Sequence, residues 1–322
     1  MRLADLDGCA VLPDSVPFPL DRPFTAKQAA AEGVTRRQLG WLVRQGFLRR
    51  MLKGVYVATQ VGDSTRLRCQ ALGLVVPTDS VVCDRHAGWL HGAEMVLAPN
   101  EHIDLRPISI FRPAGHGRLR NELADSGERN LRPDDIVEVH GMRVTTPLRT
   151  AWDLGRVRYP DRALAGIDQM LRLGAFDHGE LLQGVERFRG MRWVTVLRAV
   201  APLADGRAAS PGESVLRLRW IEARIPAPTP QLAVYRGEVL VGILDLANEE
   251  IRYAAEYDGA EWHSSPEQRE HDRERRAEMS EDDWDIDVFV AADLFGRQAN
   301  PEARLRDGAG RARRRLGLRV SG

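Results

Sequence analysis

Cysteine is scarce in this chain, and long apolar runs are missing. Three cysteines, Cys9, Cys69 and Cys83, occur among 322 residues. This small, odd number of cysteines gives no disulfide framework and no paired spacing of metal ligands. The lack of a disulfide framework favours a reducing compartment. No stretch approaches the roughly 18 consecutive apolar residues of a membrane span, and the first residues show no basic patch followed by an apolar run. We therefore expect no signal peptide, no membrane association and a cytoplasmic location.

An excess of charge of one sign is also lacking, and so is lysine. The 46 acidic residues balance the 46 basic ones, so no global field draws the chain to nucleic acid and any basic surface must be local. Lys27 and Lys53 are the only lysines. Genomic base composition is a sufficient cause of the preference for arginine over lysine. Because both lysines lie near the N-terminus, an active site in the C-terminal part cannot use a lysine. At roughly 100–200 residues per domain, the length predicts two or three domains.

Two helix-start patterns follow one another near the N-terminus. Thr25 is followed three residues later by Gln28, and Thr35 is followed in the same way by Gln38. Each pair is a capping box that opens a short helix, and a glycine closes each helix. The Leu-Lys-Gly triplet at 52–54 indicates a turn between two short apolar strands. Behind an irregular lead-in over residues 1–22, we therefore predict a winged helix-turn-helix domain within residues 1–62.

The second of these helices, from Thr35 to Gln45, is the expected DNA-recognition helix. Basic side chains there and on the wing would contact phosphates, while side chains at the start of the helix would reach base edges. The alternative is a solvated face around a protein-interaction module. The six candidate DNA-binding residues, enough for salt-sensitive binding, are Arg36, Arg37, Arg44, Arg49, Arg50 and Lys53.

The middle of the chain, residues 63–205, is predicted to be a mixed α/β domain. Residues 80–92 suggest a buried turn of chain, and Thr146 with Pro147 marks the start of a helix after a strand pair. A small-residue linker near 203–212 is the expected domain boundary. The histidines of this region are too far apart in the sequence to form a set of metal ligands. Cys83 and His86 resemble one half of a metal site, but the sequence offers no second pair of ligands. We expect these side chains, which include His91 and His140, to serve in packing.

Residues 206–322 show the order helix, three strands, helix, strand. The helix begins near Glu213, the strands are expected over 231–237, 239–247 and 251–259 as an antiparallel meander, and a charged helix is expected over 266–280. A last strand runs into a helix after Trp284, and an arginine-rich tail extends from Arg304 to Arg319. The predicted fold class is therefore α+β and multidomain: a winged helix-turn-helix, an α/β middle region and an αβββαβ C-terminal domain.

Three acidic residues of the C-terminal domain are expected to meet. Asp245 and Glu256 lie in strands that pair through a short turn, and Glu213 lies on the helix that can pack across the sheet. The alternative is an ordinary hairpin with acids near its turn. Carboxylates inside apolar strands are costly unless they are paired or bind metal, and such oxygen ligands suit Mg²⁺ or Mn²⁺.

Residues from about 210 to 295 resemble the restriction-endonuclease-like superfamily, and most of all its very-short-patch-repair-like branch, the DUF559-type domains. The matching stretches are GESVLRLRWIEARIPAPTPQ, VGILDLANEEIRYAAEYDGAEWH and HDRERRAEMSEDDWDIDVFVAADL. The resemblance implies a metal held by Asp245 and Glu256, with Glu213 as the helical acid and the carbonyl oxygen of Tyr257 as a further ligand. The lysine position of the superfamily falls on Asp258, so lysine-assisted activation of water is not implied.

The same resemblance implies four further roles. His263 would be a general acid or base, or a phosphate contact, with a capping or surface histidine as the alternative. Asp272 and Arg275 fit the Asp-x-x-Arg helix of the branch, with a solvated ion pair as the alternative. Trp284 matches a core aromatic before the last strand. Asp283 stands where the branch often has glycine, which predicts a less tight turn.

Residues 24–57 resemble the N-terminal winged helix of AbiEi-type proteins, the antitoxin regulators of a phage-abortive system. The matching stretch is FTAKQAAAEGVTRRQLGWLVRQGFLRRMLKGVYV, and HAGWLHG and VTTPLRTAWDLGR resemble the middle part of the same family. This resemblance implies DNA as a partner and a toxin-like protein as a further candidate partner.

Two functions are compatible with these patterns, and the second has a regulatory and a partner-binding form. The first is Mg²⁺-dependent hydrolysis of DNA phosphodiester bonds, with Asp245 and Glu256 holding the metal, Glu213 completing the site and His263 assisting. A double-strand break would need two copies, hence a homodimer. The alternative is an AbiEi-like antitoxin or transcriptional regulator whose nuclease-like domain is non-catalytic or binds a partner. Whether the chain is an enzyme stays open at this level.

Overall fold

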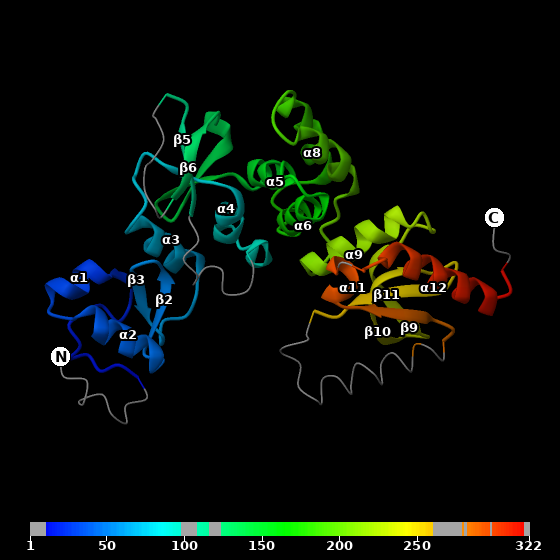
Figure 1. Cartoon of the computed structure of the whole chain (residues 1–322), viewed down its shortest axis with the longest axis horizontal. Helices are drawn as coiled ribbons and strands as arrows, with labels where there is room; N and C mark the ends of the chain where they lie inside the picture. The colour runs from blue at the N-terminus through cyan, green and yellow to red at the C-terminus, as the bar shows by residue number, and fades with distance from the viewer. Residues whose placement is uncertain are drawn as a thin grey trace. The chain divides into compact units, whose positions relative to one another are not determined.

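The computed structural model describes residues 11–97, 108–115, 124–259, 279, 282–296 and 298–318. The chain divides into two compact units, Met1–Asp153 and Leu154–Gly322. Figure 1 colours the chain from blue at the N-terminus to red at the C-terminus. Both units combine helices with sheets, as expected of an α+β protein. Among the described helices, none has the length and apolar character that crossing a bilayer requires.

The first unit opens with the winged helix-turn-helix. Both predicted capping boxes are present: Gln28 N donates to Thr25 Oγ1 over 3.1 Å, and Gln38 N donates to Thr35 Oγ1 over 3.2 Å. The three strands form an antiparallel sheet in the order β1-β3-β2. The elements are β1 (Phe24–Thr25), α1 (Ala26–Ala31), α2 (Arg36–Arg44), β2 (Leu48–Leu52) and β3 (Val55–Ala58).

The lead-in is irregular over its described part, as predicted, but it belongs to the core. Leu12, Val16 and Phe18 are buried and pack in one cluster with Phe24 of β1 and Leu42 of α2. The Phe18 and Phe24 rings stack with centroids 4.8 Å apart. These side chains enlarge the hydrophobic core of a small domain that has only two short helices.

A five-stranded mixed sheet follows in the order β6-β5-β4-β8-β7. The predicted strand pair turns at His140 and Gly141, both with positive φ, as a tight hairpin requires. Residues 80–92 are not a buried turn, because a short strand there leads directly into a buried helix. The elements are α3 (Thr65–Gly73), β4 (Val81–Val82), α4 (Asp84–Leu90), β5 (Ile108–Pro113), β6 (Ala124–Arg129), β7 (Ile136–Val139), β8 (Met142–Thr145) and α5 (Pro147–Gly155).

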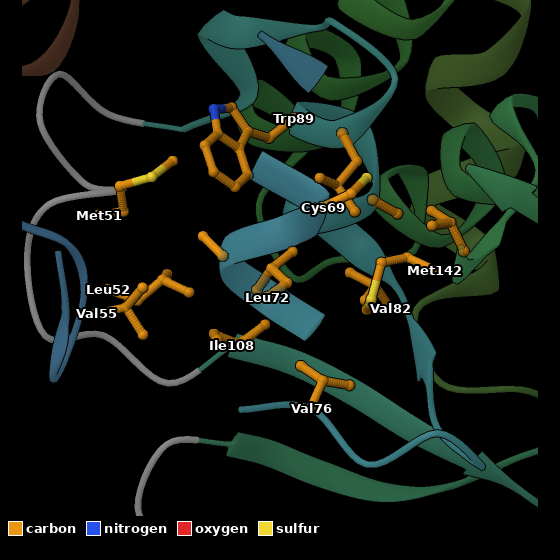
Figure 2. Packing of buried hydrophobic residues seen from close by; sticks show 14 of the residues in the cluster. Met51, Leu52, Val55, Cys69, Leu72, Val76, Val82, Trp89, Ile108 and Met142 are labelled. Carbon is orange, nitrogen blue, oxygen red and sulfur yellow. The ribbon is translucent and has the colours of Figure 1, made fainter. Parts of the chain in front are cut away.

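One hydrophobic core joins the wing to this second sheet (Figure 2). Leu52 and Val55 of the wing strands pack in the same cluster as Leu72 of α3, Trp89 of α4 and Ile108 of β5. The predicted boundary between residues 62 and 63 therefore falls inside a shared core. The winged helix rests on the middle sheet through buried apolar contacts.

The second unit begins with helices that cover the predicted boundary near 203–212. That linker is packed: a Cβ at Gly206 would lie 2.9 Å from the backbone nitrogen of Arg172. Asp168 pairs with Arg217 over 2.6 Å, across the boundary that we predicted at 205/206. The helices are α6 (Pro160–Leu171), α7 (His178–Gln183), α8 (Val194–Val200) and α9 (Pro211–Glu222).

A four-stranded sheet in the order β12-β11-β10-β9 completes the second unit. Three strands form the predicted antiparallel meander, and β12 is parallel to β11. The helix predicted over 266–280 lies outside the described residues, apart from Met279. The elements are β9 (Thr229–Arg236), β10 (Val239–Asn248), β11 (Tyr253–Tyr257), β12 (Asp285–Phe289), α11 (Ala291–Phe295) and α12 (Pro301–Arg315).

Most of the expected arginine-rich tail is a packed helix. Leu305, Ala309 and Ala312 recur at helical spacing on one face of α12 and are buried against the sheet and α9. Arg311 pairs with Asp287 of β12 over 2.9 Å. The high arginine content hides this small apolar stripe, which is why the segment resembles a solvated tail in sequence.

Candidate functional site

Helix α2 presents a basic surface. Arg36, Arg37 and Arg44 of α2 are exposed, and no ion pair joins them to any other residue that the structure describes. From residue 33 to residue 62 the chain contains six basic residues and no aspartate or glutamate. The segment therefore has a local excess of positive charge, although the acidic and basic residues of the whole chain are equal in number.

The apolar side of α2 fixes the orientation of these arginines. Leu39 and Leu42 are buried in the core of the domain, and the capping box at Thr35 sets the first turn. Arg36 and Arg37 are the first two residues after the cap, at the end of the helix that would approach base edges. Their position follows from local sequence alone.

The wing residues differ from one another. Lys53 is exposed at the tip beside Gly54, whose φ of +76° would strain a residue with a side chain. Arg50 is half-buried on β2. Arg49 is turned away from the tip, because its Nη2 donates to the carbonyl oxygen of Val61 over 3.1 Å. Of the predicted wing contacts, Lys53 is the best placed for a nucleic-acid partner.

The predicted acids of the second unit lie on adjacent strands. Leu246 pairs with Ala255, so one further step of the register brings Asp245 opposite Glu256. The register of β9 and β10 likewise brings Gln231 opposite Asp245. Glu256 is buried, with 4% of its surface exposed, and Glu213 of α9 is 7% exposed. Both of these carboxylates are therefore largely removed from solvent.

Gln231 connects two of these acids. Its Nε2 donates to Glu213 Oε2 over 2.9 Å and to Asp245 Oδ1 over 3.4 Å. Glu213 Oε2 also accepts from Ala209 N over 2.8 Å, and Asp245 Oδ2 accepts from Tyr257 N over 2.9 Å. Both carboxylates are thus used as acceptors by groups of the chain itself.

Sequence reasoning missed Gln231. It has a φ of +52° within β9, which is uncommon for a residue with a side chain. The one available signal was a long polar side chain directly after Pro230, at the start of an otherwise apolar strand. That signal is weak, because the partner acids are 18 and 14 residues away in the chain.

The described residues do not form the metal-binding group that the resemblance implies. No group of three His, Cys, Asp or Glu side chains within the described part of the chain could hold a metal ion. Glu213 and Asp245 accept hydrogen bonds from protein donors. Tyr257 contributes its backbone N–H here, and Asp258 N donates to Phe289 O over 2.8 Å. The roles of Glu213, Asp245 and Glu256 as metal ligands therefore stay a prediction.

The remaining predicted residues of this domain divide into two groups. His263, Asp272 and Arg275 lie outside the described residues. Trp284 is buried, as expected of a core aromatic. Asp283 has a φ of +67°, so the turn keeps the left-handed backbone that glycine favours even though an aspartate occupies it.

The histidines of the first unit make hydrogen bonds typical of packing. His86 Nδ1 accepts from Ser109 N over 3.1 Å, and His91 Nε2 lies 2.7 Å from Thr145 O. Burial lowers the pKa of His91, although its hydrogen bond to Thr145 opposes this. Burial also raises the pKa of the Cys69 thiol to about 11. These contacts agree with the packing role that we expected of these side chains.

A buried ionic network in the same unit was also missed. Arg149 of α5 pairs with Asp153 over 2.9 Å and with Asp135 over 2.7 Å, and all three side chains are almost fully buried. Arg129 of β6 pairs with Asp153 and with Asp84. The network fastens α5 to the sheet, which explains why the VTTPLRTAWDLGR stretch carries charges inside an apolar helix.

Comparison with known proteins gives matches along most of the chain. Residues 21–59 match the family described as "Transcriptional regulator, AbiEi antitoxin", and residues 80–203 match the "AbiEi antitoxin C-terminal domain". The second match includes parts of both compact units. The proteins "Rv2248" and "MT2308" from two strains of Mycobacterium tuberculosis, both described as uncharacterized, are each 31% identical over 280 residues, 87% of this chain and 99% of theirs. The chain therefore belongs to the family of these mycobacterial proteins and contains the N-terminal and C-terminal domains of an AbiEi antitoxin.

Proposed function

We propose that this protein is an AbiEi-type regulator that binds DNA through its winged helix. The observation that carries the proposal is the exposed, unpaired set of Arg36, Arg37 and Arg44 on a helix whose apolar side is fixed in the core. The description of the matched family as a transcriptional regulator supports it. In this arrangement α2 enters the major groove and Lys53 on the wing contacts a neighbouring phosphate.

The test is DNA binding by the full chain without metal. The DNA upstream of the gene is labelled, and binding is followed by fluorescence anisotropy at several salt concentrations. The double variant Arg36→Ala with Arg37→Ala should weaken binding and lower the slope of log K against log salt by about 0.9 for each lost phosphate contact.

A matched control removes the same charge elsewhere in the same unit. Arg66 of α3 is exposed and Arg143 of β8 is half-exposed, away from the recognition helix in sequence. The double variant Arg66→Ala with Arg143→Ala should bind like the wild type. If both double variants bind as well as the wild type does, the winged helix is not the DNA-binding element.

The antitoxin part of the proposal concerns a protein partner. The matched domain over residues 80–203 is described as that of an antitoxin, so we expect the chain to bind and neutralise a toxin-like protein. Co-expression with the product of the neighbouring gene tests this expectation. If the double variant Arg36→Ala with Arg37→Ala still restores the growth of cells that express the neighbouring gene, neutralisation of the toxin does not require DNA binding by the winged helix.

Hydrolysis of DNA by the C-terminal domain is a second candidate. It is supported by the neighbouring register positions of Asp245 and Glu256 and by the link from Asp245 through Gln231 to Glu213. Supercoiled plasmid with Mg²⁺ or Mn²⁺ tests it: cleavage should disappear in Asp245→Ala and in Glu256→Ala. Absence of cleavage by the wild-type protein removes this candidate and leaves the regulator intact.

A further inference from the structure

A second basic surface lies in the second unit, and we define it as the arginine–aromatic surface. It combines the start of α6 with the loop that leads into α8. Its aromatic residues are Tyr159, which is 53% exposed, and Trp193, which is half-buried. Its exposed arginines are Arg158, Arg162, Arg189 and Arg192.

Arg156 brings the two segments together. Its guanidinium lies over the Phe188 ring, 4.5 Å from the centroid, and its Nη1 is 4.0 Å from the sulfur of Met191. Phe188 and Met191 belong to the segment that contains Arg189 and Arg192. Arg156 itself is only two residues from Arg158, so residues 158–162 and 189–193 are neighbouring parts of one surface.

The acids next to this surface are already neutralised by other arginines. Asp161 pairs with Arg219 over 2.5 Å. Glu186 pairs with Arg198 over 2.7 Å, which lowers the pKa of that carboxyl. Arg158, Arg162 and Arg192 have no ion-pair partner among the residues that the structure describes, whereas Arg189 interacts electrostatically with Glu186. Arg158, Arg162 and Arg192 therefore give this surface a positive charge that no described carboxylate pairs with.

The aromatic rings lie among these charges. Arg158 and Arg162 lie 5.4 Å and 5.7 Å from the centroid of Tyr159, and Arg192 lies 5.1 Å from that of Trp193. Tyr159 immediately precedes α6, and its side chain does not cap the helix. An exposed ring with cationic groups on the same surface is the combination that binds bases by stacking and phosphates by charge.

We propose that the arginine–aromatic surface binds single-stranded nucleic acid, with a base stacked on Tyr159 and the flanking phosphates on the arginines. A duplex would offer phosphates to the arginines but no unstacked base to the ring. The surface belongs to the second unit and does not rest on DNA binding by the winged helix.

The test uses full-length protein in which Arg36→Ala and Arg37→Ala remove the candidate contacts of the winged helix. The probe is a fluorescein-labelled single-stranded oligodeoxynucleotide of about 20 nucleotides, compared with its duplex. Tyr159→Ala should weaken binding of the single strand at least about fivefold, because stacking on one base is lost. Tyr159→Phe keeps the ring and should bind within about twofold of its parent.

The arginines are tested through salt dependence. Arg158→Ala with Arg162→Ala should lower the slope of log K against log salt by about 0.7 for each lost contact with a single strand. The matched control, Arg306→Ala with Arg313→Ala, removes the same charge from α12, where neither side chain has an ion-pair partner among the described residues. Circular dichroism shows whether each variant is folded.

Three results would overturn the proposal. One is equal binding by Tyr159→Ala and Tyr159→Phe. Another is an equally large decrease of the salt slope in the α12 control, which would show that the effect depends only on the net charge of the protein. The last is a duplex bound through the same residues more tightly than the single strand, which would indicate a backbone-binding surface instead.

Discussion

Asp168 of α6 and Arg217 of α9 form an ion pair of 2.6 Å that is almost completely buried. Asp168 also accepts a hydrogen bond from Asp205 N over 2.8 Å, and Arg217 donates to Leu203 O. Burial raises the pKa of Asp168, while Arg217 acts against that rise. The pair joins the last part of the AbiEi-matched region to the helix that packs on the C-terminal sheet.

Arg217→Met should therefore destabilise the second unit strongly. The substitution leaves the Asp168 carboxylate buried without its cation, which typically costs about 3–5 kcal/mol. Urea unfolding of the full chain measures the effect. Asp168→Leu combined with Arg217→Met removes both charges and should recover most of the loss; a single variant as stable as the wild type would show that the pair is not formed.

Gln231→Glu should destabilise the second unit at neutral pH. It replaces a donor shared by Glu213 and Asp245 with a third carboxylate, so we expect a loss on the order of 1–3 kcal/mol. Thermal unfolding with and without Mg²⁺ measures it, and Mg²⁺ should restore part of the stability. Gln183→Glu, the same change at an exposed position of α7, should have little effect. Equal stability of Gln231→Glu and the wild type would argue against the hydrogen bonds that Gln231 donates to Glu213 and Asp245.

Gly212→Ala should disturb the contact between α9 and β11. A Cβ at this position would lie 2.0 Å from the Tyr257 ring, so overpacking should cost about 1–3 kcal/mol. Tyr257→Ala should relieve the clash in the double variant. Gly310→Ala on α12 is the control, because its Cβ would meet only the end of the Arg314 side chain, and it should stabilise the helix slightly. Denaturant midpoints of the four proteins provide the comparison.

His91 should make the first unit sensitive to mild acid. Burial lowers the folded-state pKa of His91 from its ordinary value of 6.5. The unfolded chain therefore binds a proton more readily, and the contribution of His91 to stability is lost as the pH falls below 6.5. His91→Gln keeps a donor for Thr145 O but does not titrate. Its unfolding free energy should fall less steeply between about pH 7 and about pH 5 than that of the wild type.

Much of the local structure was predictable because it depends on neighbours in the chain. The capping boxes at Thr25 and Thr35, the turn at Lys53 and Gly54, and the helix start at Thr146 all have hydrogen bonds or backbone angles that match the expectation. The strand order of the C-terminal meander follows from apolar runs separated by turns. These features involve residues within a few positions of each other.

The candidate site was predictable only in outline. Asp245 and Glu256 could be placed together because a short turn fixes the register between their strands. The role of Gln231 could not, since it depends on how α9 and β9 pack and on a backbone angle that sequence does not reveal. The hydrogen bonds that use Glu213 and Asp245 as acceptors likewise depend on that packing.

The sequence by itself determined helix α2, the position of its arginines and the alternation of strands and helices, because short-range hydrogen bonding and hydrophobic periodicity are local properties. Tertiary structure alone decided where the compact units divide. A shared core joins the wing to the middle sheet, and the Asp168–Arg217 pair closes the linker at 203–212. Both depend on contacts between residues far apart in the chain, whose burial free energy exists only once the elements have packed.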